Sequence, residues 1–241
     1  AGIEVLRAEP HGRKLRRGSH KSNAFCIVVR GISGSMADVD ERLAAVASHG
    51  VPNYFGPQRF GFNGSNVTRG MHWLRRGGRL SRNKRGMYIS SVRSFLFNQV
   101  LAHRVSRGNW NVIEDGEIAI LDGSHSVFSC TMPDPELSRR CDTFDIHPSG
   151  PLCGKEGMQP ERAALELESA ALMEHTDMVD ALKKVSSRAD RRALRLVPEN
   201  LSFSVEGDVL MLAFDLPAGN YATSLLRELV TYTDDGHIAE P

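Results

Sequence analysis

Residues 50–61 of the chain read GVPNYFGPQRFG. Three glycines and two prolines within these twelve residues disfavour a regular helix or strand. Three aromatic side chains lie between them and are suited to anchor the backbone in a core: Tyr54, Phe55 and Phe60. We therefore expect an irregular segment that is held in place by its aromatic residues.

The residues before this segment predict two strands and a helix. Residues 2–9 and 24–32 read as strands, and the second contains a β-branched run that is typical of a buried strand. A pattern that resembles a capping box begins at Ser35. It precedes an apolar helical face, so we expect a helix over Met36–His49 that stops at the following glycine.

The residues after the segment predict a longer series of elements. Amphipathic spacing indicates a helix over 89–105, and the basic, glycine-containing sequence at 75–85 reads as a loop that leads to it. Residues 109–160 predict only two short strands. The expected elements beyond residue 108 are strands within 112–121 and 126–130, helices at 161–175 and 178–195, a hairpin of 201–205 and 209–216, and a helix at 221–230.

Basic and acidic residues are segregated along the chain. Residues 1–107 carry 19 Lys and Arg against 5 Asp and Glu, whereas residues 108–241 carry 11 against 24. Of the 19 cations, 16 are Arg, whose planar guanidinium group forms paired hydrogen bonds with phosphate. The first half therefore fits a surface that contacts RNA. Pairing of these Arg side chains with the acidic half inside the fold is the alternative.

Several classes of protein find no support in the sequence. No apolar run approaches the roughly 20 residues needed to cross a membrane, and no basic-then-apolar leader pattern opens the chain. Phosphate-loop, dinucleotide-binding, HExxH and GxSxG motifs are all missing. The cysteines and histidines show no metal-ligand spacing, so we expect no metal site and free thiols in a reducing cytoplasm at Cys26, Cys130, Cys141 and Cys153.

Six ordered blocks stand out: SNAF at 22–25, GVPNYFGPQRFG at 50–61, GSN at 64–66, RNKR at 82–85, SVRSFLFNQVLAHRV at 91–105 and LPAGNYATSLLREL at 216–229. As a spaced set they resemble the tRNA pseudouridine synthase D family. The resemblance covers nearly the whole chain and is weakest over residues 122–160.

This resemblance implies isomerisation of a uridine in tRNA to pseudouridine, usually the uridine at position 13, without cofactor or metal. In the family the base is flipped into a pocket, an Asp carboxylate attacks the nucleotide, the glycosidic bond breaks, and the uracil is reattached through carbon. By resemblance, Phe25 lies against the uracil and Asn23 orders the pocket. Tyr221 takes the place of a third pocket aromatic, commonly Phe, and adds a hydroxyl group.

The family's nucleophile lies in a G-x-K-D motif upstream of the segment that matches residue 1. The nearest string in this chain, GKE at 154–156, has the wrong spacing. We therefore expect no catalytic residue here. The start without Met, in a strand-like stretch, is what a C-terminal fragment would show, and a processed or artificial terminus would look similar. The other alternative is that the missing N-terminal part is supplied separately. The alternative function is an RNA-binding module that acts without catalysis.

The implied fold class is α+β. A pseudouridine-synthase catalytic domain, with a mixed or antiparallel sheet and helices, would comprise residues 1–49 and 197–241, and an inserted α/β TRUD domain would comprise residues 50–196. We expect a cytoplasmic monomer whose partner is tRNA. The residues expected to contact RNA are Arg13, Lys14, Arg16, Arg17, Lys21, Arg59, Arg82, Lys84, Arg85 and Arg93.

Overall fold

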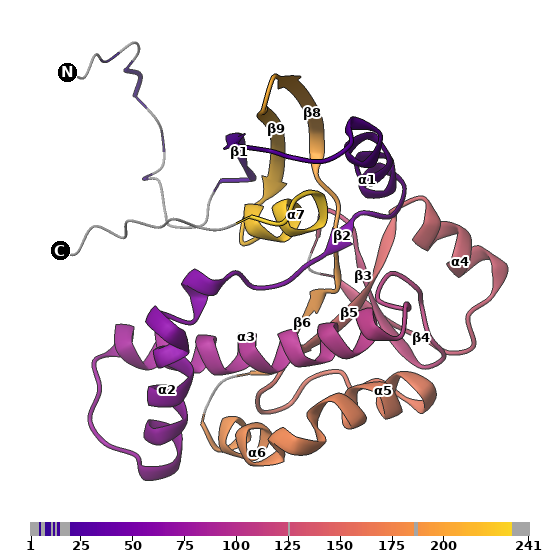
Figure 1. Ribbon diagram of the computed structural model, residues 1–241. Coiled ribbons are helices and arrows are strands. Elements are labelled where there is room, and N and C mark those ends of the chain that lie inside the picture. Colours follow the sequence, from indigo (N-terminus) through magenta and orange to yellow (C-terminus); the bar gives the residue numbers. More distant parts are fainter. Residues whose placement is uncertain are drawn as a thin grey trace.

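The computed structural model describes residues 5, 8–10, 12, 14, 20–124, 126–185 and 188–232. Within these ranges helices combine with three antiparallel sheets, which confirms the α+β class (Figure 1). Most of the strand expected at 2–9 lies outside the described residues. None of the described helices is long and apolar enough to span a membrane.

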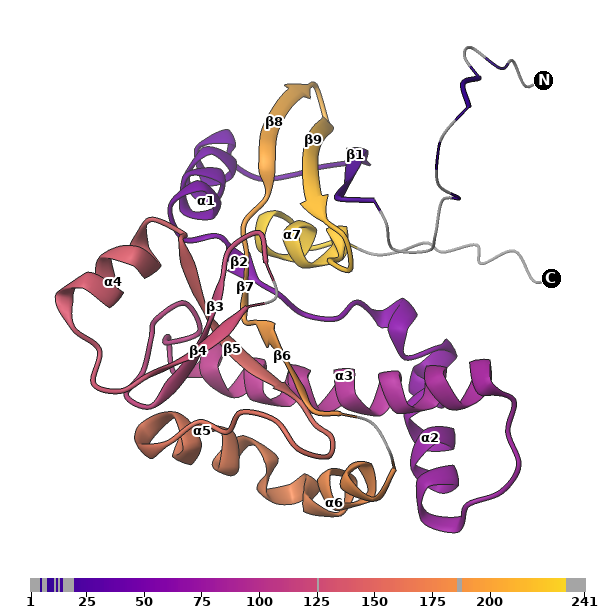
Figure 2. The same cartoon turned by 180° about the vertical axis from the view of Figure 1, so that it is seen from behind.

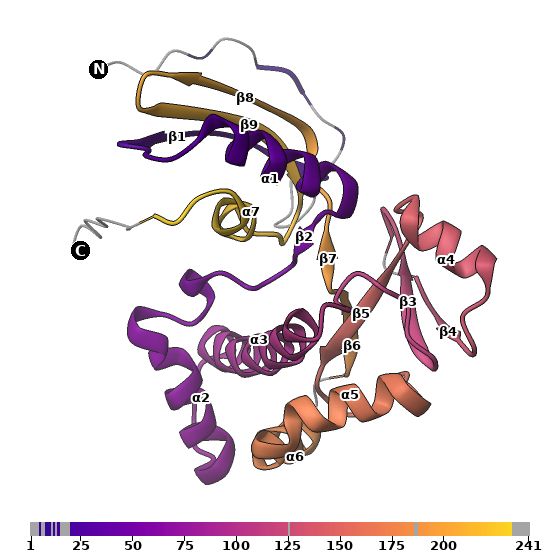
Figure 3. The same ribbon diagram turned by 45° about the vertical axis from the view of Figure 1, so that its right-hand side comes forward.

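The first sheet is built from both ends of the described chain. Its strands are β1 (Ser22–Arg30), β9 (Val209–Pro217) and β8 (Glu199–Glu206), in the order β1-β9-β8. Alternate side chains of β9 are buried, as expected of a strand with one covered face. Helices α1 (Met36–His49) and α7 (Ala222–Leu229) pack on that face, and Figure 3 shows α7 beneath the sheet.

Several local predictions are confirmed in this part of the molecule. Helix α1 has the expected bounds, and the hydroxyl of Ser35 accepts a hydrogen bond from the Ala37 amide at its start. The hairpin of β8 and β9 forms around Gly207, whose φ of 60° is readily adopted by glycine. Helix α7 buries Leu225 and Leu229 in the core.

The GVPNYFG segment begins at the junction between the first sheet and the rest of the chain. Strand β2 (Val51–Pro52) pairs with β7 (Arg195–Leu196), so the two crossings of the chain lie side by side. Gly50 has a φ of 71°, and a β-carbon there would lie 2.7 Å from the Leu196 carbonyl oxygen, so the turn requires glycine. The division at 49/50 and 196/197 remains a prediction.

The remaining elements surround one long helix. The described chain continues through η1 (Pro57–Arg59), η2 (Phe62–Gly64), α2 (Ser65–Arg76), α3 (Arg82–Ser106), β3 (Glu117–Leu121), β4 (Val127–Cys130), α4 (Pro135–Asp142), β5 (Ile146–Leu152), α5 (Arg162–Leu172), η3 (Met173–His175), α6 (Thr176–Lys184) and β6 (Asp190–Ala193). The four-stranded sheet has the order β4-β3-β5-β6. Figure 2 shows this sheet at one end of α3 and helix α2 at the other.

Two predictions about this region were wrong. The basic segment at 75–85 is not a continuous loop, because α2 extends to Arg76 and α3 already begins at Arg82, where the Ser81 hydroxyl accepts from the Lys84 amide. The helix expected at 178–195 ends at Lys184, and residues 190–193 form β6 instead. In β6 the side chains of successive arginines point to opposite faces, a two-residue period that the helical reading missed.

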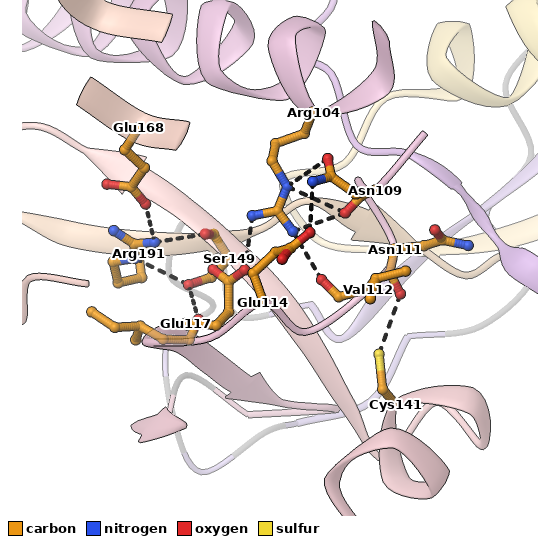
Figure 4. Close-up of polar contacts among 11 residues, drawn as sticks. Arg104, Asn109, Asn111, Val112, Glu114, Glu117, Cys141, Ser149, Glu168 and Arg191 are labelled. Carbon is orange, nitrogen blue, oxygen red and sulfur yellow. Dashed lines mark hydrogen bonds and ion pairs between the residues drawn. The ribbon is translucent and has the colours of Figure 1, made fainter. Parts of the chain in front are cut away.

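A buried polar network joins α3, β3, β5, β6 and α5 (Figure 4). Arg104 donates to the Glu117 carboxylate at 2.8 Å and to the backbone carbonyls of Asn109 and Val112. Arg191 pairs with Glu168 at 2.5 Å. Because a buried charge without a partner is costly, these carboxylates give both arginines a structural role.

Candidate functional site

Tyr221 stands at the start of α7 and is held by residues of the GVPNYFGPQRFG segment. Its hydroxyl oxygen accepts a hydrogen bond from Arg59 Nε at 2.9 Å, and its ring meets Phe55 edge to face at a centroid distance of 5.9 Å. Arg59 also donates to the Ser90 hydroxyl at 3.1 Å. The Tyr221 hydroxyl, the group in which this side chain differs from phenylalanine, is therefore hydrogen-bonded to an arginine.

Arg192 approaches the same aromatic group from β6. Its guanidinium carbon lies 4.2 Å from the Phe55 ring centroid. It donates hydrogen bonds to the side-chain oxygens of Asn53 and Asn220, at 2.7 and 2.9 Å, and to the Gly219 carbonyl at 3.1 Å. Burial, reinforced by the charge of Arg59, lowers the pKa of Arg192 to about 10. The group is therefore still a cation at neutral pH.

Because Gly56 has no side chain, Tyr221 and Thr223 can pack against the backbone of the GVPNYFGPQRFG segment. A β-carbon at this position would lie 2.8 Å from the Tyr221 ring and 2.9 Å from the Thr223 hydroxyl oxygen. These contacts are too short for any real side chain, so alanine here would displace Tyr221. Gly56, the seventh residue of the GVPNYFGPQRFG segment, thus contributes to this packing because it has no side chain.

Asn23 and Phe25 lie on β1, at the same end of the first sheet as the turn that carries Tyr221. Phe25 stacks on Phe214 with ring centroids 5.4 Å apart and an interplanar angle of 21°. Asn23 is exposed and stands opposite Leu216 in the register, and the Lys21 carbonyl accepts from the Ala218 amide at 3.1 Å. In the part of the chain that the structure describes, no hydrogen bond or ring contact joins Asn23 or Phe25 to Tyr221.

The predicted RNA-contacting residues fall into different settings. Arg82, Lys84 and Arg85 are exposed in the first turn of α3, and Arg85 lies over the Trp73 ring at 5.6 Å. Lys14 and Lys21 are exposed, whereas Arg59 is half-buried against Tyr221. The predictions for Arg13, Arg16 and Arg17 lie outside the described residues.

Arg93 does not have the placement expected of an RNA-binding residue. Its guanidinium group donates to the carbonyls of Leu152, at 2.8 Å, and Arg188, at 3.1 Å. Burial lowers its pKa. We assign Arg93 to the attachment of α3 to β5 rather than to an RNA surface.

Helix α2 was not predicted, and it carries exposed basic residues that were not among the expected RNA contacts. Arg69, Arg75 and Arg76 are exposed on it, and Arg75 pairs with Asp177 of α6. A signal was present: residues 42–113 contain 12 Arg and Lys but no Asp or Glu. A run of this length without acids indicates a coherent positive surface.

Other features of the structure do not resemble a catalytic centre. Burial raises the pKa of the Cys153 thiol to about 11, so it is not a thiolate at neutral pH. No group of three or more potential metal ligands occurs among the described residues. A cavity of about 410 Å³ between α1 and the end of α3 is lined in part by Arg42, His49 and Trp110, and by none of the predicted pocket residues.

Comparison with known proteins identifies close relatives. The family model described as tRNA pseudouridine synthase D (TruD) matches residues 1–72 and 66–229. The chain is 42% identical over 238 residues to the tRNA pseudouridine synthase D of Methylococcus capsulatus, covering 97% of this chain and 67% of the relative. It is 42% identical over 234 residues to that of Nitrosococcus oceani, covering 95% and 65%. It thus spans about two thirds of the length of these relatives.

A solved structure shares the fold. The crystal structure of a putative tRNA pseudouridine synthase D from Methanosarcina mazei matches with a TM-score of 0.66 at 18% sequence identity. The match covers 88% of this chain and 69% of the other.

Proposed function

Because the chain belongs to the TruD family of tRNA pseudouridine synthases, we propose that it forms the part of such an enzyme that binds tRNA and walls the pocket for a flipped uridine. The reaction is the isomerisation of uridine to pseudouridine, with the uridine at position 13 as the target. The protein acts as a cytoplasmic monomer and needs no cofactor or metal.

The observation that carries this proposal is the set of aromatic and polar groups at one end of the first sheet. Phe25 is half-exposed on a ring stack and can offer a face to a base, while the exposed Asn23 amide is free to pair with the edge of uracil. Tyr221 is fixed by Arg59 and Phe55, so its ring enters the pocket in one orientation. A preset aromatic wall lowers the cost of holding an extruded base.

The nucleophilic carboxylate belongs, in this proposal, to residues outside the chain. Asp215 is the acidic residue closest in register to the pocket strand, since it pairs with Ala24. Its neighbours Phe214 and Leu216 face the core, so Asp215 points to the opposite face of the sheet, where it accepts from Asn200 at 2.7 Å. It is therefore badly placed to attack a nucleotide that rests against Phe25.

An assay of pseudouridine formation on unmodified tRNA tests this proposal. We expect no product from the chain alone, and product at position 13 when the N-terminal third of the Methylococcus relative is joined to it. A tRNA with cytidine at position 13 serves as the control substrate. Pseudouridine formed by the chain alone would contradict the placement of the nucleophile, and product at another uridine would contradict the target.

The second candidate, an RNA-binding module without catalysis, is favoured by the acid-free run of residues 42–113. The same assay separates the two functions. Binding of tRNA with no product from the joined protein would support the module, provided that the joined protein is folded.

A further inference from the structure

The two neighbouring arginines of β6 have different electrostatic surroundings. Arg191 points to one face of the strand, where Glu168 neutralises it at 2.5 Å. Arg192 points to the other face and meets neutral groups, namely an aromatic ring, two Asn side chains and a carbonyl. Because burying a charge without a counter-charge is costly, the setting of Arg192 requires an explanation that the setting of Arg191 does not.

A second cation increases the local excess of positive charge. The guanidinium carbon of Arg59 lies 5.4 Å from the same Phe55 ring that Arg192 contacts. Across the described ranges of the chain, no Asp or Glu forms an ion pair with either arginine. The mutual repulsion contributes to the lowered pKa of Arg192, although burial is the larger cause.

Hydrogen-bonding groups are also left over at this place. The Nε of Arg192 and the hydroxyl oxygen of Thr223 are buried and have no hydrogen-bond partner in the described structure. Thr223 belongs to the first turn of α7, and no described side chain caps that helix N-terminus. The amides of an uncapped first turn favour a negative charge nearby.

We propose that Arg59, Arg192 and the first turn of α7 form a binding site for a phosphate group of RNA. This inference rests on the proposed function and extends it, because Arg59 is bonded to Tyr221 and so places the phosphate beside the nucleotide whose base lies against that ring. Guanidinium groups match phosphate oxygens in charge and geometry. The nucleotide is then held at two points, the base by aromatic side chains and the phosphate by the arginine pair.

Titration of the intact chain with uridine monophosphate and with uridine tests the site, with binding followed by NMR or calorimetry. We expect uridine monophosphate to bind roughly tenfold or more tightly than uridine, as expected for one charge-assisted hydrogen bond. Arg59→Gln and Arg192→Gln should remove most of that difference. The readout is the ratio of the two affinities, because any change at the base pocket that follows from loss of the Arg59–Tyr221 hydrogen bond affects uridine and its monophosphate alike. The control is Arg107→Gln, an exposed cation at the end of α3, which should keep the difference.

Arg192 packs against the Phe55 and Phe97 rings, so Arg59 provides a second variant if Arg192→Gln does not fold. Equal affinities for uridine and its monophosphate in the unaltered chain would overturn the phosphate site while leaving the base pocket standing. Conversely, binding of inorganic phosphate that depends on both arginines, without any uridine binding, would support the site and contradict the pocket. If acetate at equal ionic strength reproduces the phosphate effect, the site holds a carboxylate and the assignment to RNA is wrong.

Discussion

The hydroxyl of Tyr221 shows how one atom can tie the pocket to the rest of the molecule. Tyrosine differs from phenylalanine only in this oxygen, which can accept or donate a hydrogen bond. In this structure it accepts from Arg59, a residue of the segment that identifies the family. The hydroxyl therefore orients an arginine, and in the proposed pocket the ring face is left for the base.

Tyr221→Phe separates these two roles. Loss of a hydrogen bond to a charged, half-exposed group should lower the free energy of unfolding by about 1–2 kcal/mol, measured by urea denaturation. Tyr221→Ala should in addition weaken RNA binding by about 1–3 kcal/mol because a stacking surface is removed, an effect that the phenylalanine variant should largely escape. Tyr232→Phe, at an exposed tyrosine, is the matched control and should change neither quantity. Unchanged stability of Tyr221→Phe would show that the Arg59 bond contributes nothing.

At the scale of elements, the exposed cations of α2 and of the first turn of α3 form a basic surface, here called the basic arm. Short-range pattern was sufficient to predict α1, the β8–β9 hairpin and α7, because caps, turns and alternation are encoded locally. It failed for α2 and β6. Glycines around α2 suggested a loop, while the strand character of β6 depends on pairing with β5, about forty residues earlier in the sequence.

The triple variant Arg82→Ala, Lys84→Ala, Arg85→Ala tests the basic arm. If these side chains bind phosphates, tRNA affinity should fall, and the slope of log affinity against log salt should become shallower by roughly 0.7–0.9 for each phosphate that is no longer neutralised. Filter binding or fluorescence anisotropy at several salt concentrations measures both quantities. Arg139→Ala with Arg140→Ala on α4, where both cations have acidic partners, is the control and should leave the slope unchanged. A triple variant with the original slope would exclude this arm from the RNA surface.

At the scale of the whole molecule, the candidate site is assembled from distant parts of the chain. The proposed pocket residues Asn23, Phe25 and Tyr221 could be named from motifs, but Arg192 could not. The hydrogen bond between Arg192 and Asn53 joins residues that are 139 positions apart in the sequence. Arg192 attracts attention because no carboxylate pairs with it in the described structure. The sequence around Arg192 does not show that the residue has no acidic partner. This becomes visible only in the folded structure, where the two chain segments that join the first sheet to the rest of the molecule lie side by side.

The junction between the first sheet and the rest of the chain contains a pH-sensitive contact. His147 of β5 is buried, accepts from Arg195 Nε through Nδ1 at 3.0 Å, and faces Asp122 through Nε2 at 2.9 Å. Since Nδ1 accepts, the ring is neutral with its proton on Nε2. Burial, helped by the charge of Arg195, lowers the pKa of His147 despite the opposing effect of Asp122.

The lowered pKa predicts that stability is lost on acidification. Above about pH 6.5 His147 is neutral in both the folded and the unfolded state. Below that pH the unfolded chain binds a proton that the folded chain does not bind. The free energy of unfolding therefore falls by at most about 1.4 kcal/mol per pH unit. His147→Asn, which retains an acceptor for Arg195, should therefore show a shallower loss of unfolding free energy between pH 7 and pH 5. His72→Asn, at an exposed histidine of α2, should keep the steeper dependence of the unaltered chain.

Protonation of His147 should also loosen the start of the GVPNYFG segment. His147 contacts Arg195 of β7, and β7 pairs with β2, the strand that follows Gly50. Hydrogen exchange at Val51 and Asn53 would register this, and exchange that is independent of pH after correction for the intrinsic rate would contradict the link.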